Sequence, residues 1–318
     1  MILFKYLSPE AVTKVLGTPK IVSLRFNLPS NYNDPYELFL APDEPLDSTE
    51  EKAYYEFFVR EMPQAPVTCF SRRPESVVMW AHYCREATGI CLAVCEEKLV
   101  NQFDVAYIHD IDYSNEPSNI PSGVIRYAAA TQKNRHTQRV LELANRAAYF
   151  SKRSDWDYEQ ERRLVVPNDS VENVNGILLA NLPSECVTSV IIGPNTSSEL
   201  FGICEAWSSQ SNVNLLRMHY SKRRFEPYFT SANETLYWVE GEFKTIPYTC
   251  FECGEPIDAE QGDLCELCQV TDADRSNAAI GNQFVMCLKL GLTPGIPFVF
   301  DGLSPRGKHF TRNNQDET

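Results

Sequence analysis

The sequence predicts an α+β protein with a small metal-binding module near its C-terminus. Apolar, strand-like runs such as IVSLRF (21–26) and VTSVIIGPN (187–195) are separated by helical segments. The two kinds of segment do not alternate regularly, as they do in a doubly wound fold. Further on, two Cys-x-x-Cys pairs lie eleven residues apart, a spacing typical of a zinc site. We expect an α+β domain at residues 1–235, a zinc-binding module with a C-terminal extension at 236–310, and a disordered tail at 311–318.

Caps, turn residues and apolar periodicity divide the chain into elements. The first helix is expected at residues 8–17, where Ser8 can cap the start, Pro9 suits the first turn and Gly17 can end the helix. Further helices are expected at residues 50–61, 123–152 and 197–210, and a short helix or loop at 77–88. Strands are expected at residues 21–26, 66–71, 89–94, 103–113, 154–166, 176–182, 187–195 and 213–221.

Composition and charge narrow the class of protein. A hydrophobic content of 43% is typical of a folded soluble chain. The formal net charge of -14 excludes general nucleic-acid binding through bulk charge, although the basic stretch SKRRF (221–225) is a local exception. There is no apolar run of eighteen residues, and the N-terminus lacks the apolar core of a signal peptide. We expect a cytoplasmic protein without membrane contact.

Four clustered cysteines form the most specific motif in the chain. Cys250 and Cys253 make one knuckle, and Cys265 and Cys268 make the other. Two such knuckles complete a tetrahedral four-thiolate site, which predicts a structural zinc ion in a zinc-ribbon-like module. A closed site of this kind has no open position for catalysis. Two roles remain open, a docking surface for protein or nucleic acid and the stabilisation of a lobe with little core of its own.

An acidic pair occurs in SDWDYEQERRLVV (154–166), which we interpret as a strand. Glu159 and Glu161 would then share one face, because side chains two apart in a strand point the same way. Their repulsion is costly unless a cation or a raised pKa relieves it, and Arg163 is the candidate cation. The pair is therefore either a solvated strand face or part of a catalytic site.

Other polar and aromatic side chains cluster in short motifs of the first domain. Each has an ordinary interpretation: NDP is a common turn, a lysine is usually solvated, and tryptophan usually anchors a core. The residues singled out are Lys5, Tyr6, Arg25, Asn33, Asp34, Glu37, Ser71, Trp80, His82, Tyr83 and Trp156.

The order of these motifs resembles a bacterial family. The pattern KY, YNDPYE, CFS, MWAHY, GICL and K-x3-W-x-YE-x-E-x-R, spread over residues 3–195, is similar to the "domain of unknown function" family catalogued under the number 2971. The combination is specific although no single motif is. The four cysteines lie outside this span. The resemblance implies no particular activity.

A more distant resemblance is to ADP-ribosyltransferases, including DNA-modifying toxins. It implies a split, mixed or antiparallel sheet with flanking helices that grips NAD in a cleft. Glu159-Gln160-Glu161 resembles the acidic pair of these enzymes, and Ser71 at a strand end resembles their serine. The chain departs from the pattern in having CFS in place of Ser-Thr-Ser.

This second resemblance implies roles for the residues already named. Glu161 would stabilise an oxocarbenium-like transition state, and Glu159 would orient or deprotonate the nucleophile. His82 and Tyr83 complete the catalytic set, with Tyr83 or Trp80 stacking on nicotinamide. Lys5 or Arg25 would hold the pyrophosphate. The complete set of expected NAD-binding residues is Lys5, Tyr6, Arg25, Asn33, Asp34, Ser71, Trp80 and Arg163.

Three hypotheses follow. The first is an NAD-dependent ADP-ribosyltransferase or NAD glycohydrolase in a toxin or phage-defence system, with a protein or nucleic-acid acceptor and an operon partner. The second is a non-catalytic module whose zinc lobe binds protein or nucleic acid. The third is a metal-dependent hydrolase or nuclease with acidic and histidine ligands, namely Asp34, Glu37, His82, Glu159 and Glu161.

Overall fold

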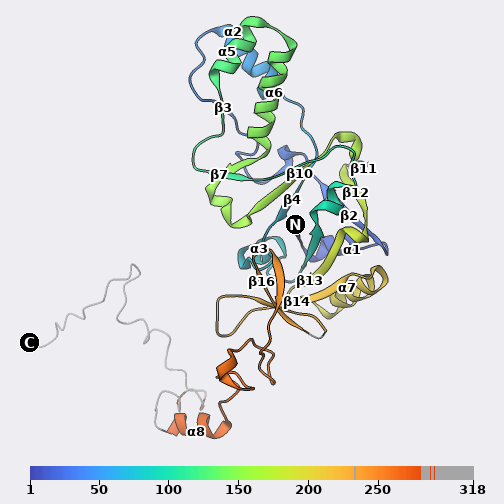
Figure 1. Ribbon diagram of the computed structural model, residues 1–318, viewed down its shortest axis with the longest axis vertical. Coiled ribbons are helices and arrows are strands. Elements are labelled where there is room, and N and C mark those ends of the chain that lie inside the picture. The colour runs from blue at the N-terminus through green and yellow to red at the C-terminus, as the bar shows by residue number, and fades with distance from the viewer. Residues whose placement is uncertain (233, 281–286, 288–289, 291–318) are drawn as a thin grey trace, which may run out of the picture. The chain divides into compact units, whose positions relative to one another are not determined.

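A ten-stranded mixed sheet dominates the larger of two units in the computed structural model, which describes residues 1–232, 234–280, 287 and 290 (Figure 1). All neighbouring strands are antiparallel except β13 and β14. The strand order is β17 (Glu242–Thr245), β16 (Thr235–Val239), β15 (Tyr228–Thr230), β14 (Asn214–His219), β13 (Val187–Ile192), β5 (Ile90–Cys95), β1 (Ile2–Leu7), β4 (Val67–Ser71), β10 (Glu161–Val165) and β6 (Tyr107–Asp110). The predicted α+β class is confirmed.

Three smaller sheets accompany the large one. A three-stranded antiparallel sheet and two parallel two-stranded ribbons make up this set. The three-stranded sheet is β11 (Glu172–Val174), β12 (Ile177–Pro183) and β2 (Ile21–Phe26), and the ribbons are β3 (Ala41–Pro42) with β8 (Asn119–Ile120) and β7 (Asp112–Ser114) with β9 (Ser151–Arg153).

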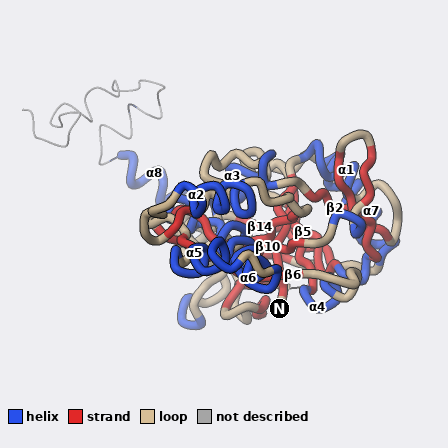
Figure 2. The backbone as a smooth tube through the Cα atoms, turned by 90° about the horizontal axis from the view of Figure 1, so that it is seen from above, coloured by secondary structure: helices blue, strands red, loops and turns tan. Residues whose placement is uncertain are grey.

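Two apolar cores cover the two faces of the central strands. Along β5, Ile90, Leu92 and Val94 belong to one core, whereas Cys91 and Ala93 belong to the other, as strand alternation requires. The first core includes α1 (Pro9–Val15), α4 (Glu96–Val100) and α7 (Ser198–Ser211), and the second includes α3 (Val77–Tyr83). In Figure 2, α1 and α7 lie on the opposite side of the strands from α2 and α5.

A separate helical lobe lies at one end of the first unit (Figure 1). It has its own apolar core, in which Val59, Ile125 and Val140 are buried. Its elements are α2 (Thr49–Tyr55), the π-helical turn η2 (Glu56–Arg60), α5 (Ser122–Thr131) and α6 (Asn134–Tyr149). The single helix predicted at 123–152 is thus two helices. Gln132 interrupts it with a left-handed backbone, φ 49° and ψ 29°.

The boundary between the units differs from the prediction. The first unit is Met1–Pro247 and does not end at residue 235, because β16 and β17 extend its sheet. The second unit begins at Tyr248 and contains the four cysteines and α8 (Asp272–Ile280). Most of the C-terminal extension and all of the predicted tail at 311–318 lie outside the described residues. Within the described residues, no helix has the length and apolarity to cross a membrane.

Candidate active site

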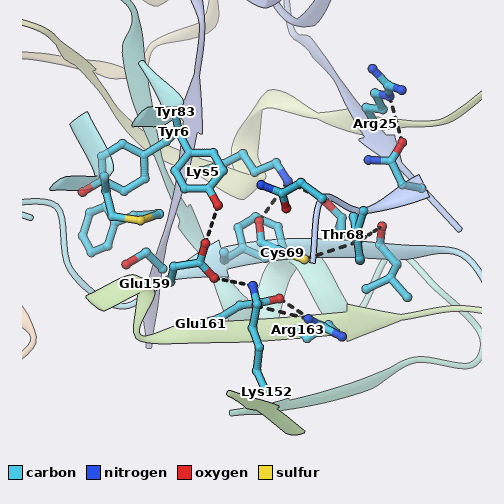
Figure 3. A pocket seen from close by; sticks show the side chains of 18 residues that line it. Lys5, Tyr6, Arg25, Thr68, Cys69, Tyr83, Lys152, Glu159, Glu161 and Arg163 are labelled. Atoms are coloured by element: carbon cyan, nitrogen blue, oxygen red, sulfur yellow. Dashed lines mark hydrogen bonds and ion pairs between the residues drawn. The ribbon is translucent and has the colours of Figure 1, made fainter. Parts of the chain in front are cut away.

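A pocket opens where β1 and β4 diverge. These strands share one register pair, Phe4 with Ser71, whereas β1 pairs with β5 at six positions. Lys5, the residue after Phe4, extends its side chain across to β4. The pocket has a volume of about 270 Å³ and is lined from β1, β2, β4, β9 and β10 and from the segments beside them. Figure 3 shows these side chains converging on one space.

The carboxylate of Glu161 is fixed by Arg163, two residues further along β10. Arg163 donates from Nε to Glu161 Oε1 at 2.8 Å and from a terminal nitrogen to Oε2 at 3.2 Å. The same guanidinium donates to Glu37 and to the carbonyl of Tyr149, the latter at 3.0 Å. Burial by itself would raise the pKa of Glu161, but Arg163 and Lys152 outweigh it and lower the pKa to about 2. Glu161 is therefore ionised at neutral pH.

Lys152 on β9 joins the two glutamates. Its ammonium donates to Glu159 Oε2 at 2.6 Å and to Glu161 Oε2 at 3.3 Å, and it lies 4.6 Å from the ring centre of Trp156. Burial tends to lower the pKa of Lys152, but the two glutamates raise it by more, so the side chain stays charged. Together with Arg163, this cation relieves the repulsion that would otherwise make the carboxylate pair costly to bury.

A left-handed turn brings Glu159 to the pocket. The predicted strand at 154–166 is wrong in its first half: Ser154–Glu159 forms the 3-10 helix η3, and β10 begins only at Glu161. Gln160 between them has φ 43° and ψ 51°. Its amide group donates to Asp157 Oδ1 at 2.6 Å and accepts from Arg72 at 3.0 Å. The two acids therefore meet through a turn and do not share a strand face.

Glu159 is the less firmly ionised member of the pair. Tyr83, at the end of α3, donates its hydroxyl to Glu159 Oε1. Burial, with a smaller contribution from Glu161, raises the pKa of Glu159, and Lys152 opposes that rise. The two carboxylates thus differ in their tendency to take up a proton, an arrangement typical of paired catalytic acids.

The part of the pocket away from Glu159 carries two cations, Lys5 and Arg25 (Figure 3). Lys5 donates to Thr68 Oγ1 and to the carbonyl of Cys69, both at 2.8 Å, and Arg25 donates to Asn27 Oδ1 at 3.0 Å. Burial lowers the pKa of Lys5. Among the described residues, neither cation has a carboxylate within ion-pair distance. In Figure 3, Arg25 lies well away from Glu159.

The structure brings together nine of the twelve predicted site residues. Those that line the pocket are Lys5, Tyr6, Arg25, Asn33, Ser71, Tyr83, Glu159, Glu161 and Arg163. Tyr6, Ser71 and Arg163, which were expected to bind NAD, use their polar groups for contacts within the protein. The Tyr6 hydroxyl donates to the carbonyl of Arg73 at 2.5 Å, Ser71 Oγ accepts from the N–H of Arg73 at 3.1 Å, and the three guanidinium nitrogens of Arg163 are all engaged. Arg163 therefore organises the site and is not free to bind a ligand.

Three predicted residues lie outside the pocket lining. Trp80 has 0% exposure and donates its indole N–H to Pro74 at 2.7 Å, so it packs in the core and cannot stack on a ligand. Asp34 is buried and accepts from the N–H of Tyr36 at 2.9 Å, as a turn residue does. His82 is exposed on α3.

Several residues of the site are not among the predicted ones. Lys152 was visible only as the lysine of the K-x3-W motif, because nothing local indicates its two glutamate partners. Tyr113 accepts the backbone N–H of Glu161 at 2.8 Å. Tyr32 contacts Cys69, with 3.3 Å between the hydroxyl and the sulfur. Burial raises the pKa of Cys69 to about 12, so this thiol is neutral and not a nucleophile.

The four cysteines of the second unit fit a tetrahedral metal ion. Their sulfur atoms all lie within 4.8 Å of one another, and those of Cys253 and Cys265 are 3.7 Å apart. Tetrahedral zinc with bonds of about 2.3 Å would separate its sulfurs by about 3.8 Å. Residues 248–280 contain eight acids and one arginine. That charge repels a phosphate backbone and disfavours nucleic acid as a partner of this module.

Comparison with known proteins supports one of the two resemblances. A family model described as "Protein of unknown function (DUF2971)" matches residues 79–164. This segment runs from α3 into β10 and carries Tyr83, Lys152, Glu159, Glu161 and Arg163. The match supports the family resemblance drawn from the motifs. Searches of curated proteins and of solved structures found no significant match, so the resemblance to ADP-ribosyltransferases gains no support from them.

Proposed function

We propose that the pocket is the active site of an enzyme that breaks the nicotinamide–ribose bond of NAD. The ADP-ribose would pass to a macromolecular acceptor or to water. The observation that carries this proposal is the pair of buried carboxylates, Glu159 and Glu161, which face one cavity in unlike electrostatic environments. Carboxylates paired in this way serve reactions that develop positive charge at a sugar carbon.

The proposed reaction uses the two acids differently. When the bond between the anomeric carbon and the pyridinium nitrogen breaks, its electron pair leaves with neutral nicotinamide and the ribosyl group becomes positive. The ionised Glu161 stabilises that charge. Glu159 then accepts the proton of the attacking nucleophile, and the hydroxyl of Tyr83 holds it in place.

The charge at the other side of the pocket supports a phosphate-bearing substrate. Lys5 and Arg25 lack acidic partners among the described residues, although the whole chain has a net charge of -14. Two cations of this kind suit a pyrophosphate. The volume of about 270 Å³ is near the low end for ligand pockets, so the pocket would enclose one end of the dinucleotide.

The metal-dependent hydrolase is less well supported by the geometry. Both oxygens of Glu161 accept from Arg163, and Lys152 also bonds one of them. His82 is exposed, and Asp34 is used by its own turn. Within the described ranges, the group of side chains arranged as metal ligands is the four-cysteine cluster. We propose zinc for that cluster, where Cys250, Cys253, Cys265 and Cys268 would hold the ion and stabilise the module.

Nicotinamide release tests the proposed reaction. Purified protein, shown by metal analysis to hold one zinc per chain, would be incubated with NAD with and without cell extract. We expect release by the wild type and a loss of at least about a hundredfold in Glu161→Gln. Glu172→Gln, at an exposed acid on β11, is the matched control and should be fully active. Absence of release from folded wild-type protein under every condition would overturn the proposal.

A further inference from the structure

Lys152 contacts two glutamates, but only one of them depends on it as its sole counter-ion within the described part of the chain. Glu161 has a second cation, since Arg163 binds both of its oxygens. Glu159 has none: among the described residues, Lys152 is the only cation paired with it, and Tyr83 supplies its remaining hydrogen bond. Removing the ammonium would leave Glu161 compensated and Glu159 without a counter-ion.

The contact between Lys152 and the two glutamates is buried, so the loss of a counter-ion there would have a large effect. The side chains of Lys152, Glu159 and Glu161 have relative exposures of 8%, 5% and 4%. Solvent therefore does little to screen the charges, and an ionised carboxylate at this depth needs a partner. The titratable groups that face Glu159 come from five elements, including its own. They are Tyr83 on α3, Tyr113 on β7, Lys152 on β9, Tyr158 on η3, and Glu161 on β10.

The backbone around Lys152 suits a positioning role. Lys152 pairs with Tyr113 in the parallel ribbon of β7 and β9. Tyr113 in turn accepts the backbone N–H of Glu161 at 2.8 Å, so the ribbon contacts the acidic pair at two points. The ribbon is anchored next to α6, where Ser151 donates its hydroxyl to the carbonyl of Ala147 at 2.5 Å. The ammonium is thereby delivered to a defined place between the two carboxylates.

We propose that Lys152 is the positioning residue of the acidic pair and the counter-ion that keeps Glu159 ionised. In this role Lys152 acts through Glu159, to which its ammonium donates at 2.6 Å. In the proposed reaction, on which this role rests, Glu159 must be free of a proton when it accepts one from the nucleophile. Without Lys152 the buried carboxylate of Glu159 would have no counter-ion among the described residues, so it would take up a proton more readily.

Titration of Glu159 tests this assignment directly. The full chain would carry 13C at its glutamate carboxyl carbons, and the Glu159 signal would be identified by its absence in Glu159→Gln. We expect Lys152→Met to raise the titration midpoint of Glu159 by at least about one pH unit. Lys152→Arg, which keeps the charge, should restore most of the wild-type midpoint. Lys14→Met removes an exposed lysine on α1 and should leave the midpoint unchanged.

Two results would overturn the proposal. The first is an unchanged Glu159 midpoint in folded Lys152→Met. The second is an equal rise in Lys152→Arg and Lys152→Met. If Lys152→Met does not fold, Lys152→Gln keeps a hydrogen-bond donor without the charge and takes its place in the same comparison. Because the titration needs no substrate, it still decides the role of Lys152 if NAD is not turned over. If NAD is turned over, the acid limb of the rate profile should move upward by the same shift.

Discussion

The two sides of the pocket are both charged, but their charges are compensated differently. On the acidic side, Glu159 and Glu161 are bound by Lys152 and Arg163, and every charge has a partner within the protein. On the basic side, Lys5 donates only to neutral oxygens and Arg25 only to an amide. The acidic side is internally compensated, whereas the basic side has charge available for a ligand. In the proposed reaction, the acidic side would carry the chemistry and the basic side would bind the substrate phosphates.

The largest effect should come from removing the cation at the centre of the acidic side. Arg163→Met leaves two buried carboxylates, Glu161 and Glu37, without their shared partner. We expect a loss of about 3–5 kcal/mol in the free energy of unfolding, measured by urea titration with tryptophan fluorescence. Arg153→Met is the control, because this arginine pairs with Asp155 at the exposed surface and should cost under about 1 kcal/mol. A similar cost for both variants would show that the acidic side is not internally compensated.

The second-largest effect should be on the pH dependence of stability, in which the acidic and basic sides of the pocket act at different pH. The folded pKa of Glu161, about 2, is below its ordinary 4.5, so its contribution is present above pH 4.5 and is lost as the pH falls toward 2. A shift of this size corresponds to about 3 kcal/mol. The lowered pKa of Lys5 acts at the alkaline end, where stability rises as the pH passes from the folded pKa toward 10.5.

The free energy of unfolding, measured from acid to alkaline pH, checks both the effect of Glu161 and the effect of Lys5. Glu161→Gln should weaken the acid-side dependence and keep the alkaline rise. Lys5→Met should do the reverse. If each variant altered both ends of the profile, the two sides would be one coupled charge network and the comparison would fail.

The substitution Lys5→Met should have the smallest effect on stability but a clear effect on ligand binding. Lys5→Met removes a cation that the protein itself does not compensate, so the free energy of unfolding should change by no more than about 1 kcal/mol. The affinity for pyrophosphate or ADP-ribose, measured by calorimetry, should fall at least about tenfold, because a charge-assisted hydrogen bond is lost. Lys14→Met should alter neither quantity. Unchanged affinity in Lys5→Met would remove the basic side from the binding site.

Local sequence signals predicted much of the fold. The strands IVSLRF and PVTCFS, the α7 helix and the division at Gly89 all depend on periodicity and turn residues within a few positions. Two of the errors lie where one residue adopts a left-handed backbone. Gln132 divides a helix, and Gln160 ends a 3-10 helix before β10. Neither is glycine or asparagine, so composition gave no warning.

The sequence by itself determined the four-cysteine site and the proximity of Glu159 to Glu161, since both follow from short spacing along the chain. Only the tertiary structure decided what surrounds those acids. Lys152 and Tyr83 reach them from separate elements, and Glu37 shares the guanidinium of Arg163 with Glu161. The pocket exists because β1 and β4 separate after one register pair. Spacing encodes local neighbours, whereas the partner of a buried charge depends on strand register and on packing between distant segments.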